Sequence, residues 1–431
     1  MMSSERALIS ALQAYNTFTV TSAPFSDYVH LIHPGDFGSW LGMLNADQIG
    51  VPPRAPLMGL TAEVSGATLL IGDADGAILV DPGRYTPMPL QSRPPLAIVI
   101  THAHRDHFDG LSDALQSWKD VPVYLSEITR TLLTDSLQRD NANALARELS
   151  ERAILVAPDA TLTVGRFRMT AYDAGHCLGA TAVHLEDAET GQGILIAGEF
   201  SRRKVGSVCH KIPQLSVNTL FVEAIHADDH LPTGVNGQNN VEFTSKLDAA
   251  YAQGKTIVIA AASLAEMQEV YAICALHQRR GGLPEYPLYV GNLRPVMKSA
   301  LKHLERVEPW DLDVTFTNSI QEEAINILTC AFEGQTDDGH FSSAYAQDSA
   351  NEDILWLYPE RYSALKPEKA ALYRVFTHAS LCEIGEMVLV QKPANVCLYS
   401  GGCHGSVLAG FLARSGFALH DFSGAAGSFH F

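Results

Sequence analysis

Residues 97–111 read AIVITHAHRDHFDGL, and the rest of the chain is best interpreted outward from this stretch. An apolar run typical of a buried strand leads directly into three histidines and an aspartate: His102, His104, Asp106 and His107. In an extended segment His102 and His104 point to the same side, and Asp106 and His107 follow where the chain turns. Two offset pairs of this kind can serve two neighbouring metal ions. The alternative is a polar loop whose histidines share no role.

The composition is that of an ordinary globular protein. The chain has 431 residues, of which 46% are hydrophobic and 18% are charged. This length predicts about two to three domains. The formal net charge of −18 argues against a broad electrostatic surface for long nucleic acid, although it leaves room for a local basic groove.

The sequence gives no sign of a membrane or secretory protein. It contains no run of about 20 apolar residues, so we expect no membrane partner. The first residues, MMSSERALISALQAYNTF, lack the basic-then-apolar order of a signal peptide. Seven scattered cysteines without a C-x-x-C pair are expected to be free thiols rather than disulfides or a zinc knuckle. Together these features predict a cytoplasmic chain.

From Gly59 onward, short apolar runs alternate with helical segments. Residues 68–83, TLLIGDADGAILVDPG, predict a β-hairpin that turns at residues 74–76. The alternation is typical of an α/β sandwich with helices outside its sheets. A second unit begins near Asn239, because residues 243–278 read as helix, strand and helix, which is typical of a small parallel sheet.

Three motifs resemble those of one superfamily. THAHRDHFDG at 101–110 matches the H-x-H-x-D-H signature of the metallo-β-lactamase superfamily. DAGHCLGAT at 173–181 resembles the next motif of that superfamily, and ILIAGEFSRR at 194–203 resembles the strand that usually ends in Gly-Asp. The resemblance implies a metallo-β-lactamase αββα sandwich.

Further motifs resemble the β-CASP branch, which includes ribonuclease J-like enzymes and the mRNA 3′-end-processing endonucleases. TLFVEAIHA at 219–227 resembles the first extra motif of this branch, with Glu223 as its acid. Residues 254–270 resemble the opening strand and helix of its inserted domain, and residues 375–402 its closing segment, with His378 as the second extra motif. The resemblance therefore implies a parallel α/β insertion. The expected divisions are an N-terminal extension of unknown role at 1–56, a discontinuous metallo-β-lactamase domain at 57–235 and 365–431, and a β-CASP-like insertion at 236–364.

The resemblance implies a centre of two divalent ions, either Zn²⁺ or Mn²⁺. The expected ligands are His102, His104 and His176 for one ion, Asp106 and His107 for the other, and Glu199 as the bridge between them. Glu199 stands where the family has aspartate, which predicts an altered metal spacing rather than loss of metal. The last family histidine falls on Ser400, so His404 is the candidate replacement, with a helix-capping or core role as the alternative.

The expected catalytic residues are Asp106, Glu223 and His378. The resemblance implies that His378 protonates the leaving oxygen while Glu223 orients its ring. A satisfied core histidine is the alternative for His378. Asp81 is expected either to support the ligand loop or simply to form a turn before Pro82.

The implied activity is hydrolysis of RNA or single-stranded nucleic acid by a hydroxide that two metal ions generate. A smaller or non-nucleic substrate is the alternative, favoured by the acidic composition, by Ser400 and by Ala265-Glu266. The family has a Gly-Arg pair at the latter positions, and its guanidinium would pair with phosphate. A third hypothesis is a catalytically silent subunit that binds an active protein partner, and a homo-oligomer is also compatible with the sequence.

Overall fold

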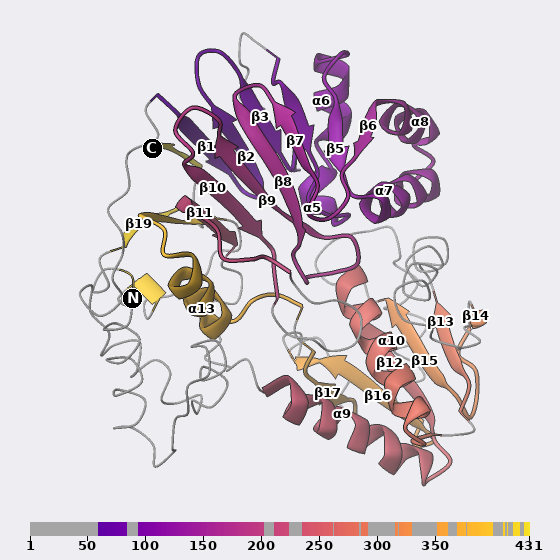
Figure 1. The fold of residues 1–431 in the computed structure, drawn as a ribbon. Coiled ribbons are helices and arrows are strands. Elements are labelled where there is room, and N and C mark those ends of the chain that lie inside the picture. Colours follow the sequence, from indigo (N-terminus) through magenta and orange to yellow (C-terminus); the bar gives the residue numbers. More distant parts are fainter. Residues whose placement is uncertain are drawn as a thin grey trace, which may run out of the picture.

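A computed structural model describes most of the chain from Gly59 onward, and the expected extension at 1–56 lies outside the described residues. The described residues are 59–83, 94–201, 211–223, 235–261, 263–283, 286–291, 315–317, 319–329, 351–360, 369–375, 377–399, 408–409, 412, 417–422 and 426–431. They form two sheets that face one another and a third sheet in a separate unit (Figure 1).

The first sheet has the strand order β20-β1-β2-β3-β4-β5-β6. Its strands are β1 (Thr61–Ser65), β2 (Thr68–Gly72), β3 (Ala77–Val80), β4 (Ala97–Val99), β5 (Val123–Leu125), β6 (Ala153–Leu155) and β20 (Gly427–His430). Strands β2 and β3 pair antiparallel from Leu69↔Val80 to Gly72↔Ala77, so the predicted hairpin is confirmed. Its turn is closed by a bond from Asp73 N to Gly76 O of 3.1 Å.

The second sheet packs its inner face against the first. Its order is β19-β18-β11-β10-β9-β8-β7. These strands are β7 (Thr161–Val164), β8 (Phe167–Asp173), β9 (Thr181–Asp187), β10 (Gly193–Gly198), β11 (Val217–Glu223), β18 (Asn395–Tyr399) and β19 (Ala418–Asp421). Successive side chains of β2 point to opposite faces of the first sheet. Leu69 and Ile71 pack in the core between the two sheets, whereas Leu70 packs under the helices.

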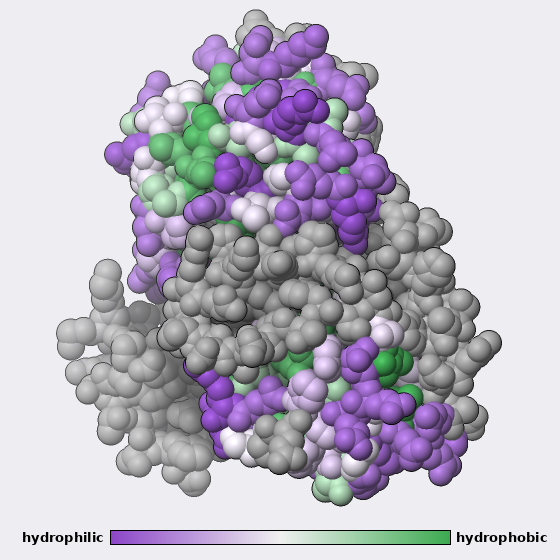
Figure 2. All heavy atoms as spheres, turned by 90° about the vertical axis from the view of Figure 1, so that its right-hand side faces the viewer, coloured by the Kyte–Doolittle hydropathy of each residue, from purple (hydrophilic) through white to green (hydrophobic). Residues whose placement is uncertain are grey.

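Helices cover the outer face of each sheet, which confirms the αββα sandwich. Helices α5 (Arg105–Phe108), α6 (Leu111–Ser117), α7 (Glu127–Arg139) and α8 (Asn143–Arg152) lie outside the first sheet, and α13 (Leu381–Gln391) lies outside the second. Figure 2 shows that the face around α7 and α8 is largely hydrophilic, as expected for helices whose apolar residues point inward. No helix among the described residues combines the length and the apolarity needed to cross a membrane.

The third sheet is parallel throughout its described pairs. Its order is β14-β13-β15-β12-β16-β17, with β12 (Thr256–Ala261), β13 (Leu288–Gly291), β14 (Thr315–Thr317), β15 (Ile325–Thr329), β16 (Ile354–Pro359) and β17 (Ala371–Tyr373). Helices α9 (Val235–Tyr251) and α10 (Leu264–Arg279) pack on one face. The sequence placed residues 365–431 in the first unit, but β17 pairs with β16. A run as short as Ala371–Tyr373 does not indicate which sheet it joins, and we propose that the insertion extends through β17.

Candidate metal centre

The expected site residues follow the ends of strands in the two facing sheets. His102 comes after β4, His176 after β8, Glu199 directly after β10, and Glu223 is the last residue of β11. Strands β10 and β11 run parallel, so their carboxyl ends lie at one edge of the sheet. His104 is extended (φ −82°, ψ 146°) and precedes α5, which turns the following residues back toward the same edge.

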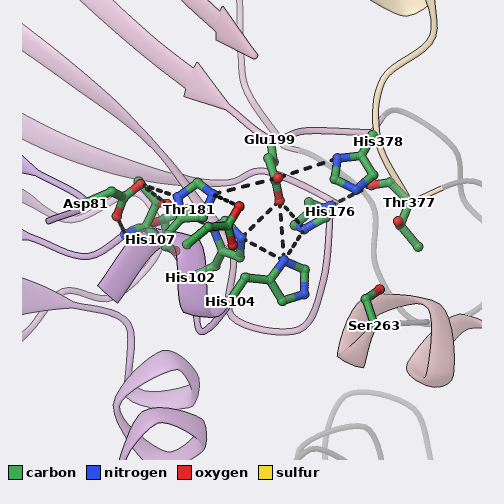
Figure 3. A network of polar contacts seen from close by, with 12 residues as sticks. Asp81, His102, His104, His107, His176, Thr181, Glu199, Ser263, Thr377 and His378 are labelled. Atoms are coloured by element: carbon green, nitrogen blue, oxygen red, sulfur yellow. Dashed lines mark hydrogen bonds and ion pairs between the residues drawn. The ribbon is translucent and has the colours of Figure 1, made fainter. Parts of the chain in front are cut away.

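Four ligand atoms form a compact first cluster around the Glu199 carboxylate (Figure 3). Glu199 Oε2 lies 3.0 Å from His102 Nε2, 3.5 Å from His104 Nδ1 and 2.5 Å from His176 Nε2. His104 Nδ1 in turn lies 3.0 Å from His102 Nε2 and 3.1 Å from His176 Nε2. Tetrahedral zinc ligands at bond lengths of about 2.0–2.2 Å lie roughly 3.3 Å apart. This cluster therefore fits a divalent metal ion in both chemistry and spacing.

Neighbouring groups fix which nitrogen each of two histidines turns toward the cluster. His176 Nδ1 lies 2.7 Å from Thr377 O, and because a carbonyl only accepts, Nδ1 carries the proton and Nε2 is left as a ligand. His102 Nδ1 lies 3.0 Å from Thr101 Oγ1. That hydroxyl donates to Asp81 Oδ2 at 2.6 Å, so it accepts from His102 and leaves Nε2 free to bind metal.

A second cluster joins Asp106, His107 and Glu199. His107 Nε2 lies 3.7 Å from Glu199 Oε1 and 3.8 Å from Asp106 Oδ2. The His107 side chain is 1% exposed, whereas that of Asp106 is 59% exposed. Glu199 thus faces the first cluster through Oε2 and the second through Oε1. Ser400 and His404 lie outside the described residues.

Asp81 orients the imidazole of His107 in the second cluster. Its Oδ2 accepts from His107 Nδ1 at 2.9 Å, and its Oδ1 accepts from Thr101 N at 2.7 Å. Asp81 is 1% exposed and has φ 49°, so it combines a turn conformation with an orienting contact. Both roles considered from the sequence are present in one residue.

Glu223 and His378 border the clusters on the side of Glu199. Each of the three residues offers one atom within 4.8 Å of the others, and His378 Nδ1 lies 3.6 Å from Glu199 Oε1. The ring of His378 is 4.6 Å from that of His176 between centroids. His378 therefore lies beside the clusters, with its side chain 12% exposed.

Burial and charge set the protonation of the histidines. Burial lowers the pKa of His102 well below its usual value, and the nearby His107 lowers it further. Burial also lowers the pKa of His104, although Glu199 opposes this effect. Burial acts in the same direction on His107, but Asp81 overrides it and holds the pKa of His107 well above its usual value. These lowered pKa values favour the neutral imidazole of His102 and His104, the form that binds metal.

The pKa values of the two buried glutamates, Glu199 and Glu223, are shifted in opposite directions. Burial would raise the pKa of Glu199, but His176, His378 and His102 together hold the pKa of this carboxyl well below its usual range. Burial raises the pKa of Glu223 well above its usual range, and the charge of Glu199 adds to this. Glu199 therefore ionises more readily than Glu223.

Helix α10 of the inserted unit approaches the centre with its N-terminus. Its N-cap is Ser263, whose hydroxyl accepts from Glu266 N at 3.2 Å, and Figure 3 shows Ser263 on the same side of the cluster as His104. Repulsion of a bound phosphate by Glu266 would require its carboxylate to lie at the surface. Glu266 is only 2% exposed, so its carboxylate is buried instead.

Sequence reasoning missed two residues that hold the His176 loop. Thr377 acts through its backbone carbonyl, which any residue would provide, so no sequence signal marks it. Gln268 accepts from Leu178 N at 3.0 Å, although 90 positions separate the two residues. Its side-chain type allows such a bond, but only the tertiary fold reveals the partner.

Comparisons with known proteins agree with this geometry. The family model described as "Metallo-beta-lactamase superfamily" matches residues 62–208. The transcription termination factor FttA of Methanothermobacter thermautotrophicus is 25% identical over 214 residues, which cover 46% of this chain and 33% of that protein. RNase aCSPSF2 of Saccharolobus solfataricus is 25% identical over 275 residues, covering 59% of this chain and 54% of that protein.

A shorter protein matches as well. The probable metallo-hydrolase YqgX of Bacillus subtilis is 29% identical over 145 residues, which cover 31% of this chain and 65% of YqgX. The chain thus spans about a third to two thirds of the length of these curated relatives. The family-model match shows a metallo-β-lactamase domain in residues 62–208, and the longer matches show that the chain is similar to FttA and RNase aCSPSF2 over about half of its length.

Proposed function

We propose that this chain is a metal-dependent phosphodiesterase that hydrolyses RNA or single-stranded nucleic acid. The observation that carries the proposal is the convergence of a four-ligand cluster with His378 and Glu223 at one edge of the sandwich. His378 beside the metal ligands is placed to supply the proton that the leaving oxygen of a phosphodiester needs. The name of RNase aCSPSF2 supports the same class of substrate.

The metal ligands would be those of the two clusters. His102, His104 and His176 would hold one ion, Asp106 and His107 the other, and Glu199 would contact both. Zn²⁺ suits the histidine-rich first cluster, and Mn²⁺ is compatible with the more carboxylate-rich second one. When bound, such ions supply an activated water at neutral pH and stabilise negative charge on phosphate oxygens.

His378 would donate the proton to the departing oxygen. It borders the clusters and its side chain is 12% exposed, so substrate can reach it. Glu223 offers an oxygen within 4.8 Å of a ring nitrogen of His378, and this oxygen would accept from the ring. This arrangement would hold the His378 ring in one orientation while the other nitrogen faces the substrate.

The N-terminus of α10 would attract the substrate phosphates. Backbone N–H groups at a helix N-terminus carry partial positive charge and bind anions, and Ser263 marks this end of α10 beside the centre. Because Glu266 is buried, its carboxylate opposes phosphate less than its position in the sequence predicted.

The test compares two substrates in the parent protein and in His378→Ala. One is a labelled single-stranded RNA, and the other is bis(p-nitrophenyl) phosphate, whose leaving group departs without a proton. We expect Zn²⁺ or Mn²⁺ to support cleavage of both, and His378→Ala to slow RNA cleavage by about 10²–10⁴-fold. The activated diester should lose much less, and metal content should stay at the parent value.

Other outcomes would overturn parts of the proposal. An equal loss on both substrates would remove His378 from the role of proton donor. Turnover of the activated diester without RNA cleavage would favour a smaller substrate, which the net charge of −18 and the absence of an arginine at position 266 also favour. Turnover of neither substrate by the metal-loaded protein would contradict the hydrolase itself.

A further inference from the structure

The loop that carries His176 is held from two sides. On one side, Gly179 O accepts from Ser126 Oγ at 2.8 Å and from Thr129 Oγ1 at 2.9 Å, both at the start of α7. On the other side, Leu178 N donates to Gln268 Oε1 at 3.0 Å. The first contact lies within the sandwich, whereas Gln268 belongs to helix α10 of the inserted unit.

The contact from the inserted unit is fully buried. Gln268 is 0% exposed, and because a backbone N–H can only donate, the side-chain oxygen must face Leu178. The Leu178 side chain packs in the same apolar cluster as Leu264 and Met267 of α10. A hydrogen bond and an apolar contact therefore fix the loop to the same two turns of α10.

The loop is short and closed, so a shift at Leu178 reaches His176. Ala174 N bonds to Ala180 O at 2.9 Å across the loop, and Gly175 and Gly179 turn the chain with φ 78° and 84°. His176 lies two positions before Leu178 inside this closed turn. With its Nδ1 also bonded to Thr377, its ring has little freedom to correct for a displaced backbone.

We propose that Gln268 is a positioning residue that couples the inserted unit to the first metal cluster. It holds the His176 loop so that the third histidine meets His102 and His104, and docking of the inserted unit thereby sets the affinity of this cluster for metal. The proposal concerns metal binding alone, so it stands or falls independently of the substrate.

The first test pairs two glutamines of α10. Gln268→Met keeps the length and burial of the side chain but removes the acceptor for Leu178 N. Gln278→Met is the matched control, because Gln278 bonds instead to Tyr286 O within the inserted unit. Zn²⁺ affinity, measured by competition with a chromophoric chelator, should fall by about 10–100-fold in Gln268→Met, as for other groups that orient metal ligands. The control should match the parent.

The thermal midpoint of each metal-free variant separates positioning from general stability. Equal affinities in the two glutamine variants, or a loss of affinity that follows only the loss of stability, would overturn the proposal. Gln268→Glu keeps an oxygen for Leu178 N and should restore most of the affinity. Failure of a folded Gln268→Glu protein to do so would also count against it.

The second test needs no variant. Coupling is reciprocal, so metal binding by His176 must also stabilise the packing of α10 against the His176 loop. In the parent protein, Zn²⁺ should slow amide hydrogen exchange in residues 174–180 and in the first two turns of α10. Slower exchange in the loop with no change in α10 would overturn the proposal.

Discussion

The two halves of the metal centre differ in how the fold builds them. The side chains of His102, His104 and His176 are 1%, 14% and 0% exposed, and they come from two segments, after β4 and after β8, around the buried Glu199. In the second half only His107 and the shared Glu199 are buried, while Asp106 is 59% exposed. The first position is therefore fixed by the core of the sandwich, and the second depends partly on a surface side chain.

This difference predicts unequal metal binding. Buried polar atoms in the first cluster have lost their water, and a metal ion replaces those lost interactions directly. An exposed carboxylate such as Asp106 keeps its hydration and its rotamer freedom until it binds, so less free energy is gained there. We therefore expect the first equivalent of metal to bind more tightly than the second.

The largest expected effect follows from removing a ligand of the first position. His176→Ala should abolish the tight equivalent and slow hydrolysis by about 10³-fold or more, since bound metal supplies several kcal/mol of transition-state stabilisation. Elemental analysis beside a kinetic assay measures both effects. A variant that kept the tight equivalent would contradict the assignment of the first position.

The next largest effect tests the second position. Asp106→Asn should weaken the second equivalent by about 100-fold or more, at or beyond the upper end of what orienting groups contribute, and leave the tight one unchanged. A chelator titration that resolves two equivalents is the measurement. If both equivalents weakened together, the two positions would be one coupled site and the contrast between them would disappear.

Asp81 connects the two positions and should affect them unequally. Asp81 accepts directly from His107 but reaches His102 only through Thr101. Asp81→Asn replaces one acceptor oxygen by a donor, so it should weaken the second equivalent by about 10–100-fold and the first by less. The buried mismatch should also cost about 1–3 kcal/mol in the free energy of unfolding. A larger loss at the first equivalent would reverse the expected order.

The sandwich and the residues of the two clusters could be expected from the sequence because the strands and motifs that indicate them are short contiguous stretches. The spacing of His102 and His104 places both on one side of an extended segment. His176 and Glu199 were expected from the resemblance of their motifs to those of the superfamily.

The missed features depend on tertiary contacts or on burial. Gln268 meets Leu178 only because α10 seats on the sandwich, and the residue type alone does not identify that partner. Glu266 was expected to oppose phosphate because its charge is visible in the sequence, whereas its 2% exposure is not. The place of β17 in the inserted sheet was missed because a three-residue run carries too little periodicity to choose a sheet.

The smallest expected effect concerns the contact that holds the His176 loop from within the sandwich. Ser126 caps α7 by accepting from Thr129 N at 3.0 Å, and it shares Gly179 O with the hydroxyl of Thr129. Ser126→Ala should therefore cost about 1 kcal/mol of stability as a lost cap, but leave metal affinity unchanged because Thr129 still donates to Gly179 O. Thr129→Val should likewise spare metal affinity.

The double variant decides whether these two donors are redundant. Ser126→Ala with Thr129→Val leaves Gly179 O without either hydroxyl, so the tight equivalent should weaken more than the sum of the single effects predicts. Chelator competition on all three variants gives the coupling directly. Additive effects would mean that Gly179 O does not help to place His176, and the first position would then rest on the inserted unit more than on the sandwich.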